Sequence, residues 1–433
     1  MSQGADYHQD AILNRLLSDA QSLYPTEIEL SLDRMERLLR DLGDPHLSIP
    51  PVIHIAGTNG KGSTLAILQS LLEHSGYSVH KMTSPHLIHI TERFIIAGQQ
   101  STPQQLINGL THILHINNGK DITYFELLTA LGFYLFAQSK ADFTLLETGM
   151  GGKYDASNVI PHPICTIITA ISKDHCEFLG NDIMQIAEEK AGIIKKDFPC
   201  IIGRQESSLI NQKLMHNQSS PFFICNKEWA VKQDNDRIVF QWDQEEVFPS
   251  PNLIGAHQID NAGNALAAYF LLAQSNYIQP ACRASIKNAL QNIQWHGRMQ
   301  PLNIGSHQDI WLDGGHNPAA GQAIAKQAQQ WEISEPRPLY LILGMMSRKD
   351  ITGFIKPIQP YLNGVIVTSV MDEPDALNQY NLSQKLKDLG IPIIDQTDNP
   401  IHYCQNNNLP KNARILITGS LYLAGQILSQ IKP

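Results

Sequence analysis

The sequence predicts an α/β protein with a mainly parallel sheet in its N-terminal part, and two observations support this fold class. Short, continuously apolar runs, each bounded by Gly, Pro, Ser or Asn, recur at residues 52–55, 143–146, 164–170 and 200–202. Such runs are typical of strands buried on both faces of a parallel sheet. Helical patterns lie between them, for example at residues 64–74 and 182–195. Strands that alternate with helices favour right-handed crossovers within α/β layers.

A second α/β series follows a region of different pattern. Between residues 228 and 248, two β-rich runs flank residues 234–236, which predicts an antiparallel hairpin, and residues 264–273 have an apolar helical pattern. The later expected strands lie at residues 310–312, 339–343, 364–368, 391–394 and 415–418. Pro392 makes the fourth of these an edge strand or one that starts late. We place a domain boundary near Gly297, which gives domains of residues 1–296 and 297–433.

Composition excludes several classes of protein. The 433 residues carry a net charge of −9, so no basic field is available to hold a nucleic-acid backbone or an anionic membrane. The six cysteines form no CxxC pair, which argues against a zinc knuckle. The N-terminus lacks the basic start of a signal peptide, and the most apolar stretch, residues 127–137, is shorter than the roughly 18 residues of a spanning helix. We expect a cytoplasmic protein without nucleic-acid or membrane partners.

The most specific signal is a glycine-rich turn between an expected strand and an expected helix. Residues 54–64 read HIAGTNGKGST. Glycines let consecutive backbone N–H groups point inward, the helix N-terminus adds positive charge, and a lysine can reach the outer phosphates of a nucleotide. The spacing differs from the standard GxxxxGK[ST] form because Gly62 separates Lys61 from Ser63. Ser63 and Thr64 either cap the following helix or contribute to the nucleotide site.

This loop resembles that of the Mur ligase superfamily, and further motifs narrow the resemblance to the folylpolyglutamate synthase/dihydrofolate synthase family. The matching segments are GTNGKGST at 57–64, SPHL at 84–87, TER at 91–93, TYFE at 123–126, ETGMGGKYDASN at 147–158, DH at 174–175, LG at 179–180, EKAGI at 189–193, HQ at 257–258, GR at 297–298, DGGHNP at 313–318 and GSLYLAG at 419–425. They follow the expected order over nearly the whole chain. The resemblance implies an ATP-binding P-loop domain followed by a smaller, Rossmann-like glutamate ligase domain.

The family joins a carboxylate to the amine of glutamate at the expense of ATP. Oxide is a very poor leaving group, so the carboxylate is first phosphorylated to an acyl phosphate, which the amine then attacks. Both steps concentrate negative charge, and catalysis must therefore rest on positioning and on cations. Lys61 is the candidate that neutralises the β- and γ-phosphates. The resemblance assigns further contacts with ATP to Thr58, Asn59, Gly60, Gly62 and Ser63.

A magnesium ion is the second cation that the resemblance implies, with contacts from Ser84, Glu147 and His175. Glu147 ends an apolar strand, at the edge where α/β sheets bind ligands, and a buried carboxylate there is costly unless it is paired or bound to a metal. His175 alone favours a structural role, and imidazole is an unusual magnesium ligand. Its metal contact therefore follows from the resemblance.

Lys190 has two opposite interpretations. It follows Glu188 and Glu189 in a helical pattern, which predicts an exposed lysine with acidic neighbours. The resemblance instead implies a catalytic lysine that is carbamylated, which turns a cation into an anion that can orient the metal site. The sign of the charge at this position stays open.

The second domain contributes fewer candidate residues. The resemblance assigns nucleotide contacts to Arg298 and Asp313, together with Asn261 of the first domain, and places His316 and Ser420 toward the nucleotide or the incoming glutamate. His316 is therefore a catalytic candidate. Gly315 stands where the family usually has Ala, which leaves the flanking Asp and His intact.

The substrate side is matched by two segments. These comprise Thr123, Tyr124, Phe125 and Glu126 in one segment and Lys153, Tyr154 and Asp155 in the other. The aromatic rings of Tyr124 and Phe125 either stack on a flat pterin or belong to the core. Residues 26–30 resemble the dihydropteroate loop only loosely, with Glu29 where Asp is usual, so dihydrofolate synthase activity has less support than polyglutamylation.

These observations lead to one hypothesis and three alternatives. We expect an ATP- and magnesium-dependent ligase, a monomer, that adds L-glutamate to dihydropteroate and to the γ-carboxyl of reduced folates. One alternative is folylpolyglutamate synthase activity alone. A second is a muramyl or cyanophycin-type ligase with another carboxylate substrate, against which the SPHL, TYFE and DH motifs argue. The third is a P-loop nucleotide switch without synthetic chemistry, which leaves Asp313 and His316 unexplained.

Overall fold

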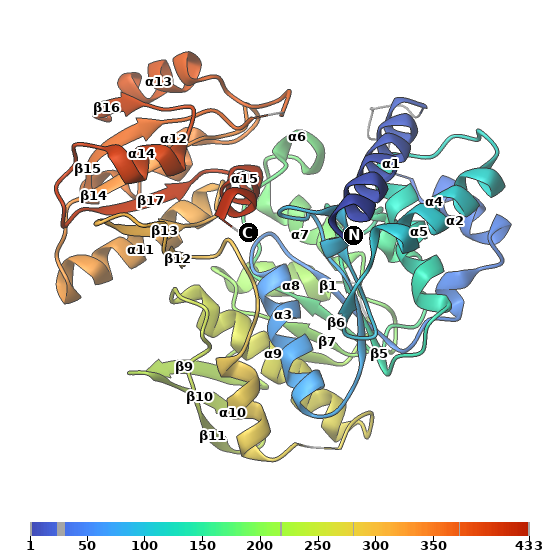
Figure 1. The fold of residues 1–433 in the computed structure, drawn as a ribbon. Coiled ribbons are helices and arrows are strands. Elements are labelled where there is room, and N and C mark those ends of the chain that lie inside the picture. The colour runs from blue at the N-terminus through green and yellow to red at the C-terminus, as the bar shows by residue number, and fades with distance from the viewer. Residues whose placement is uncertain (1, 24–30, 217–218, 280, 372, 432–433) are drawn as a thin grey trace. The chain divides into compact units, whose positions relative to one another are not determined.

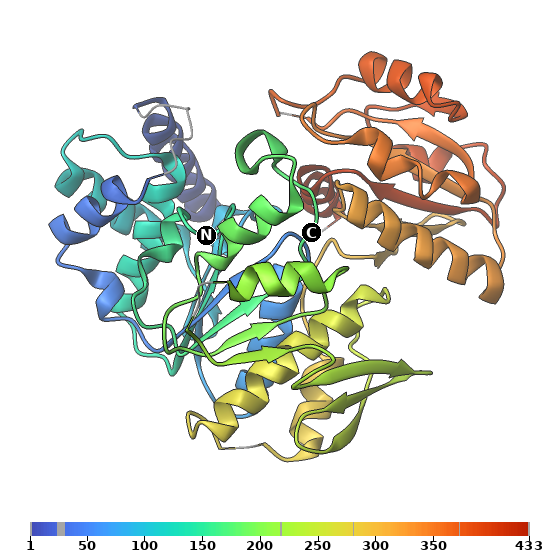
Figure 2. The same ribbon diagram turned by 180° about the vertical axis from the view of Figure 1, so that it is seen from behind.

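The computed structural model describes residues 2–23, 31–216, 219–279, 281–371 and 373–431. The chain divides into two compact units. The first comprises Met1–Ile171, His175–Ser250 and Asn261–Asn292, and the second comprises Ser172–Asp174, Pro251–Asp260 and Ile293–Pro433. Each unit contains a largely parallel sheet with helices, so the predicted α/β class is confirmed (Figures 1 and 2).

The sheet of the first unit has eight strands in the order β4-β3-β2-β5-β1-β6-β7-β8. From β2 to β8 in this order neighbouring strands pair in parallel, whereas β3 and β4 add an antiparallel edge. The strands are β1 (Val52–Ala56), β2 (Val79–Met82), β3 (Phe94–Ile96), β4 (Gln99–Gln100), β5 (Phe143–Glu147), β6 (Cys165–Ile168), β7 (Cys200–Ile202) and β8 (Phe222–Ile224). The four apolar runs of the sequence are β1, β5, β6 and β7, and the central ones are fully buried.

Helices cover both faces of this sheet (Figures 1 and 2). One face carries α3 (Lys61–His74), α9 (His257–Gln274) and α10 (Arg283–Gln291); the other carries α4 (Pro103–Asn117), α5 (Tyr124–Ala137), α7 (Ile183–Ala191) and α8 (Ser208–Met215). The remaining helices are α1 (Ser2–Leu23), α2 (Asp33–Asp41), α6 (Cys176–Leu179) and the short η1 (Pro45–Leu47), η2 (Ile90–Arg93) and η3 (Ala156–Val159). Helix α7 ends before Gly192, earlier than the predicted residue 195.

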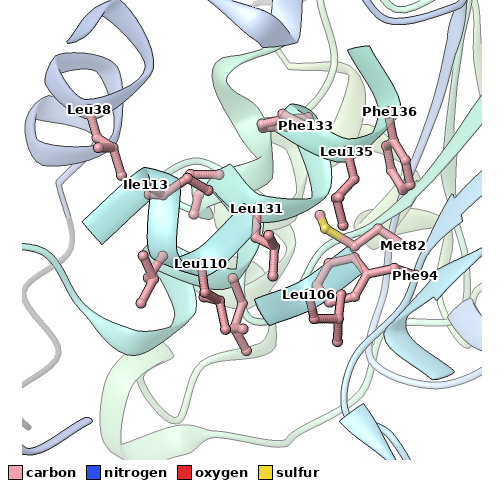
Figure 3. Packing of buried hydrophobic residues seen from close by; sticks show 14 of the residues in the cluster. Leu38, Met82, Phe94, Leu106, Leu110, Ile113, Leu131, Phe133, Leu135 and Phe136 are labelled. Carbon is pink, nitrogen blue, oxygen red and sulfur yellow. The ribbon is translucent and has the colours of Figure 1, made fainter. Parts of the chain in front are cut away.

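The core between the sheet and α5 is closely packed (Figure 3). Helix α5 is apolar on nearly all sides and packs against β3 and against Met82 at the end of β2. A Cβ on Gly132 would lie 2.7 Å from the Sδ of Met82 and 3.2 Å from the ring of Phe94, so this glycine permits the close approach. On the same face, the imidazole of His80 stacks on Phe136 with 4.8 Å between ring centroids. These contacts fix the end of β2, which borders the site.

The predicted hairpin is confirmed and gains a third strand. Strands β9 (Ala230–Asp234) and β10 (Arg237–Gln241) pair antiparallel around Asn235, which has a positive φ of 54°. Strand β11 (Glu245–Pro249) then pairs with β10. Asn tolerates the left-handed conformation that such a turn requires.

The sheet of the second unit has the order β12-β13-β17-β14-β15-β16. Only β12 runs antiparallel to its neighbour. The strands are β12 (Gln300–Leu302), β13 (Asp309–Leu312), β14 (Leu339–Leu343), β15 (Leu362–Val367), β16 (Ile393–Gln396) and β17 (Arg414–Thr418), and the helical segments are α11 (Pro318–Ser334), α12 (Ile351–Ile355), η4 (Gln359–Tyr361), α13 (Gln379–Asp388), α14 (Pro400–Asn406) and α15 (Leu421–Ile431). Strand β16 lies at the edge and starts after Pro392, as predicted.

The six cysteines all lie within the described residues, and none of them forms a disulfide. Within the residues that the structure describes, no helix combines the length and the apolar character needed to cross a membrane.

Candidate active site

The glycine-rich loop connects β1 to α3 and is held by the segment after β6. The backbone N–H groups of Thr58 and Asn59 both donate to the carbonyl of Ala170, at 3.0 and 3.3 Å. The hydroxyl of Thr169 donates to the carbonyl of Asn59 at 2.8 Å. The loop therefore starts helix α3 from a fixed position, with the N–H groups of the first turn directed at the site.

Two glycines of this loop cannot be replaced without movement of a neighbour. Gly57 has a φ of 155°, and a Cβ there would lie 1.8 Å from the hydroxyl of Thr169. Gly60 has a φ of 87°, and its Cβ would lie 2.1 Å from the amide oxygen of Asn261. The second contact places Asn261, a predicted nucleotide residue, directly against the loop. Thr169 belongs to none of the sequence motifs and had no predicted role, although its position at the carboxyl end of β6 is a signal that could have found it.

Lys61 and Lys190 converge on one backbone oxygen. Their Nζ atoms donate to the carbonyl of Gly57, at 3.2 Å from Lys61 and 3.0 Å from Lys190. Lys190 is only 4% exposed, so the local prediction of an exposed lysine is wrong. It shares the buried face of α7 with Ile186 and Ala187, at positions i−4 and i−3, and that spacing was the missed signal.

Glu147 stands at the carboxyl end of β5, beside β1, and is 6% exposed. Its Oε1 lies 3.9 Å from the Nζ of Lys61, and its Oε2 accepts a hydrogen bond of 3.3 Å from the backbone N–H of Ser84. The cost of burying this carboxylate is thus offset by a cation and a backbone donor. The structure brings together Lys61, Ser84 and Glu147, which lie far apart in the sequence.

The donor set fits a magnesium ion in part. Ser84 and Glu147 are neighbours through the backbone N–H of Ser84, and their hydroxyl and carboxylate are hard oxygen ligands of the kind that magnesium prefers together with retained waters. His175 precedes α6 with a left-handed φ of 51°, and its imidazole is a less usual ligand. Among the described residues, no group of three His, Cys, Asp or Glu side chains is arranged to hold a metal. Waters would therefore complete the coordination of an ion held here.

Asp155 holds the turn that follows Glu147. Its carboxylate accepts hydrogen bonds from the backbone N–H groups of Gly149 (2.8 Å) and Met150 (2.9 Å) and from the backbone N–H (3.0 Å) and the hydroxyl (2.5 Å) of Ser157. Burial raises the pKa of Asp155, and these hydrogen bonds oppose the shift. The neighbouring predicted substrate residues, Lys153 and Tyr154, are exposed, with the Lys153 ammonium 4.9 Å from the centroid of the Tyr154 ring.

His54 extends this network into β1. Its Nε2 lies 2.8 Å from the hydroxyl of Ser157, and burial lowers the pKa of His54 to about 3. The native state therefore keeps His54 neutral, whereas the unfolded chain takes up a proton below about pH 6.5. The contribution of His54 to the free energy of unfolding therefore falls as the pH drops from about 6.5 toward 3, by about 1.4 kcal/mol per pH unit.

We expect the His54→Gln variant to lose less stability than the wild type between pH 7 and pH 5, by about 2 kcal/mol. Urea unfolding at the two pH values measures the difference. The pKa values of His80 and His86 are also lowered by burial, so the wild-type slope is a sum, and only the comparison isolates His54. The exposed His115→Gln is the control. An unchanged pH dependence in His54→Gln would contradict the assignment.

A cavity lies between the ends of β2 and β5 and the first turns of α5. We call it the β2–β5 cavity. Its lining residues are Met82, Thr83, Ser84, Arg93, Phe94, Phe125, Leu128, Thr129 and Glu147. Tyr124 and Phe125 are both partly buried and pack against the core. Phe125 also lines the cavity, and its ring packs on Gly149. A contact of either ring with a pterin stays a prediction.

The side chains of Thr123 and Glu126 form hydrogen bonds with the backbone at the start of helix α5. The Thr123 hydroxyl accepts from the backbone N–H of Glu126 at 3.2 Å, and the backbone N–H of Thr123 donates to Glu126 Oε2 at 2.7 Å. Arg34 binds the same carboxylate through two nitrogens, each at 3.2 Å. The two contacts between Thr123 and Glu126 form a capping box. The other expected substrate segment, residues 26–30, lies outside the described residues.

In the second unit, the turn after β13 is tightly held. Asp313 accepts hydrogen bonds from the backbone N–H groups of Gly315 (2.7 Å) and Met299 (2.9 Å). A Cβ on Gly315 would lie 2.6 Å from Asp313 Oδ1. This short distance favours glycine at the position where the family usually has alanine. Ser420 is buried and its hydroxyl accepts from a backbone N–H, while Arg298 is partly exposed.

His316 belongs to a cluster that the sequence did not predict. Its Nε2 lies 3.4 Å from Asp174 Oδ2, and its Nδ1 lies 3.2 Å from the carbonyl of Gly314. Asp174 also pairs with Lys349 at 2.7 Å and accepts from the side chain of Asn317 at 3.0 Å. Asp174 matched the family motif without a role, and nothing in the local sequence singles out Lys349.

A phosphate loop whose lysine meets a carboxylate at the edge of a parallel sheet, followed by a second α/β unit, fits a ligase of the Mur type. Family models agree: the Mur ligase middle domain matches residues 55–269, and the Mur ligase, glutamate ligase domain matches residues 297–421. Within this class, the chain belongs to the dihydrofolate synthase/folylpolyglutamate synthase family of ATP-dependent ligases.

Two relatives match along almost their full length. The chain is 30% identical over 428 residues to a probable dihydrofolate synthetase of Schizosaccharomyces pombe, covering 94% of this chain and 99% of the relative. It is 29% identical over 422 residues to the dihydrofolate synthase/folylpolyglutamate synthase of Bacillus subtilis, covering 94% and 96%.

Solved structures are similar over the same length. E. coli FolC in complex with DHPP and ADP superposes with a TM-score of 0.85 at 26% identity, covering 97% of each chain. The bifunctional folylpolyglutamate synthase/dihydrofolate synthase of Yersinia pestis, complexed with AMPPNP and Mn ion, gives a TM-score of 0.84 at 25% identity, covering 96% of this chain and 97% of that one.

Proposed function

We propose that this chain is an ATP-dependent carboxylate–amine ligase that adds L-glutamate to dihydropteroate, forming dihydrofolate, and to the γ-carboxyl of reduced folates. The observation that carries the proposal is the meeting of Lys61, Ser84 and Glu147 beside the phosphate loop. Membership of a family whose members are named for both activities supports the same pair of substrates. The chain then acts on small molecules, as a cytoplasmic monomer.

Each part of the site has a role in this chemistry. The loop residues 58–63 and Asn261 hold ATP in the first domain, residues 1–296, and Arg298 and Asp313 contribute from the second, residues 297–433. Lys61 stabilises the charge that develops as the γ-phosphoryl group moves to the substrate carboxylate. Glu147, 3.9 Å from Lys61, keeps that ammonium directed at the phosphates.

Ser84, Glu147 and His175 would hold a magnesium ion, which when bound supplies positive charge to the phosphate oxygens. We propose that Lys190 is carbamylated. Its Nζ lies in a buried position on the carbonyl of Gly57, where a carbamate would place an anion beside the loop. The proposal further includes His316 and Ser420 on the glutamate side.

Substrate contacts complete the proposal. Phe125, which lines the β2–β5 cavity, is suited to stack on the pterin, and Thr123, Tyr124 and Glu126 shape the same helix end. Lys153, Tyr154 and Asp155 contribute the other segment. Asp155 acts there through the backbone turn that it holds, because its oxygens accept hydrogen bonds from that turn.

An ADP-release assay tests the function directly. Dihydropteroate and tetrahydrofolate are each supplied with ATP and magnesium, with and without L-glutamate. We expect ADP release with both substrates only when glutamate is present. Release with tetrahydrofolate alone would remove the dihydrofolate synthase activity. Release that needs neither a carboxylate nor glutamate would favour a nucleotide switch, and activity with UDP-muramyl precursors instead would favour a cell-wall ligase.

A further inference from the structure

The β2–β5 cavity has an apolar wall and a polar end. Met82, Phe94, Phe125 and Leu128 form the apolar wall, and Figure 3 shows Met82 and Phe94 facing the core helices. The polar end carries Ser84 and Glu147, the two residues already placed beside the phosphate loop, together with Arg93. The cavity has room for about one water-sized group, so only the charged end of a ligand would enter it.

Arg93 lies at the end of η2 and lines the cavity, and a hydrogen bond fixes the orientation of its side chain. Its Nε donates to Nδ1 of His86 at 2.9 Å. The loop that carries His86 is itself held by Glu92, whose carboxylate accepts from the backbone N–H groups of Leu87 (2.8 Å) and His89 (3.0 Å). A guanidinium held at Nε has a fixed plane, which directs its terminal nitrogens.

The charges of the cavity call for a cation besides Lys61. Glu147 places a negative charge at the polar end, and Lys61 is its partner at 3.9 Å. Glu147 repels a substrate carboxylate in the same cavity, so a second positive group, besides the magnesium ion proposed for Glu147, would favour its binding. Arg93 lines the cavity with Glu147, and a planar guanidinium is the side chain best matched to a carboxylate because it binds both oxygens at once.

We propose that Arg93 binds the carboxylate of the pterin substrate that becomes phosphorylated, and that His86 is the positioning residue that sets the plane of its guanidinium. This inference rests on the proposed function and names the group that recognises the reacting end of the substrate. Arg93 was part of a matched motif in the sequence but carried no predicted role.

Equilibrium binding without turnover tests this recognition apart from the function itself. Calorimetry on the full chain with ADP compares dihydropteroate with an analogue in which an aniline ring replaces the aminobenzoate, so that only the carboxylate is missing. We expect Arg93→Gln to weaken dihydropteroate at least about tenfold, the factor for the loss of a single charge-assisted hydrogen bond, and to leave the analogue unchanged. Arg93→Lys should lose less, because it keeps the charge without the two-pronged geometry. The exposed Arg237→Lys is the matched control.

The positioning role of His86 has its own variants. His86→Ala should weaken dihydropteroate severalfold, and His86→Gln, which restores an acceptor for Arg93 Nε, should recover part of that loss. The double variant Arg93→Gln/His86→Ala should bind no worse than Arg93→Gln alone. The proposal would be overturned if Arg93→Gln and Arg93→Lys weakened the binding of both ligands equally. It would also be overturned if neither variant changed the binding of either ligand. Wild-type ADP release decides the proposed function separately, so the two failures are distinguishable.

Discussion

The Lys61→Ala variant should lose at least about a thousandfold of the glutamate-dependent ADP release. Lys61 opens helix α3, and its Nζ lies 3.2 Å from the carbonyl of Gly57 and 3.9 Å from Glu147. Alanine removes the cation that would balance the phosphates and leaves the buried Glu147 without this partner. The loss should appear mainly in kcat, because charge develops on the transferred phosphoryl group in the transition state.

Two companion variants make the Lys61 result specific. Lys61→Arg keeps the charge but changes its shape and reach, so it should also lose activity, although less than alanine. Lys140→Ala, on an exposed lysine of the same unit, should keep wild-type ADP release. Full ADP release by Lys61→Ala in the presence of dihydropteroate and glutamate would rule out the phosphate loop as the catalytic site.

Much of the fold could be predicted because local patterns carry it. Strands β1 and β5 are continuously apolar, as strands buried on both faces must be, and Asn235 marks the turn of the hairpin. The exact ends of elements depended on single residues. Gly192 ends α7, and Pro392 delays β16. Strand β11 was missed because its acidic, half-exposed sequence gains strand geometry only by pairing with β10.

The site could be predicted in its parts but not in its contacts. Lys61 and Glu147 were visible as a loop lysine and a strand-end carboxylate, yet only the parallel register of β1 and β5 brings them together. The burial of Lys190 depends on the packing of α7. The pairing of Asp174 with Lys349 joins residues 175 positions apart, which no local pattern can signal.

Glu147→Gln should lower ADP release by about a hundredfold to a thousandfold and raise the magnesium concentration needed for half-maximal rate. The amide has nearly the same size, and its oxygen can still accept from the backbone N–H of Ser84, so the ends of β2 and β5 stay in place. What changes is the charge. A neutral side chain is a weaker magnesium ligand, and it no longer attracts Lys61 at 3.9 Å.

The magnesium dependence separates the two roles of this carboxylate. If Glu147 binds the metal, excess magnesium should restore part of the rate in Glu147→Gln, whereas if it only orients Lys61 the loss should persist at every magnesium concentration. Because Ser84, the other proposed oxygen ligand, lies beside Glu147, we expect partial recovery. The exposed Glu332→Gln should behave as wild type at every magnesium concentration. Wild-type rates and an unchanged magnesium dependence in Glu147→Gln would remove this carboxylate from the site. A loss that persists at every magnesium concentration would instead show that catalysis depends on the ion pair between Lys61 and Glu147, whose carboxylate is 6% exposed.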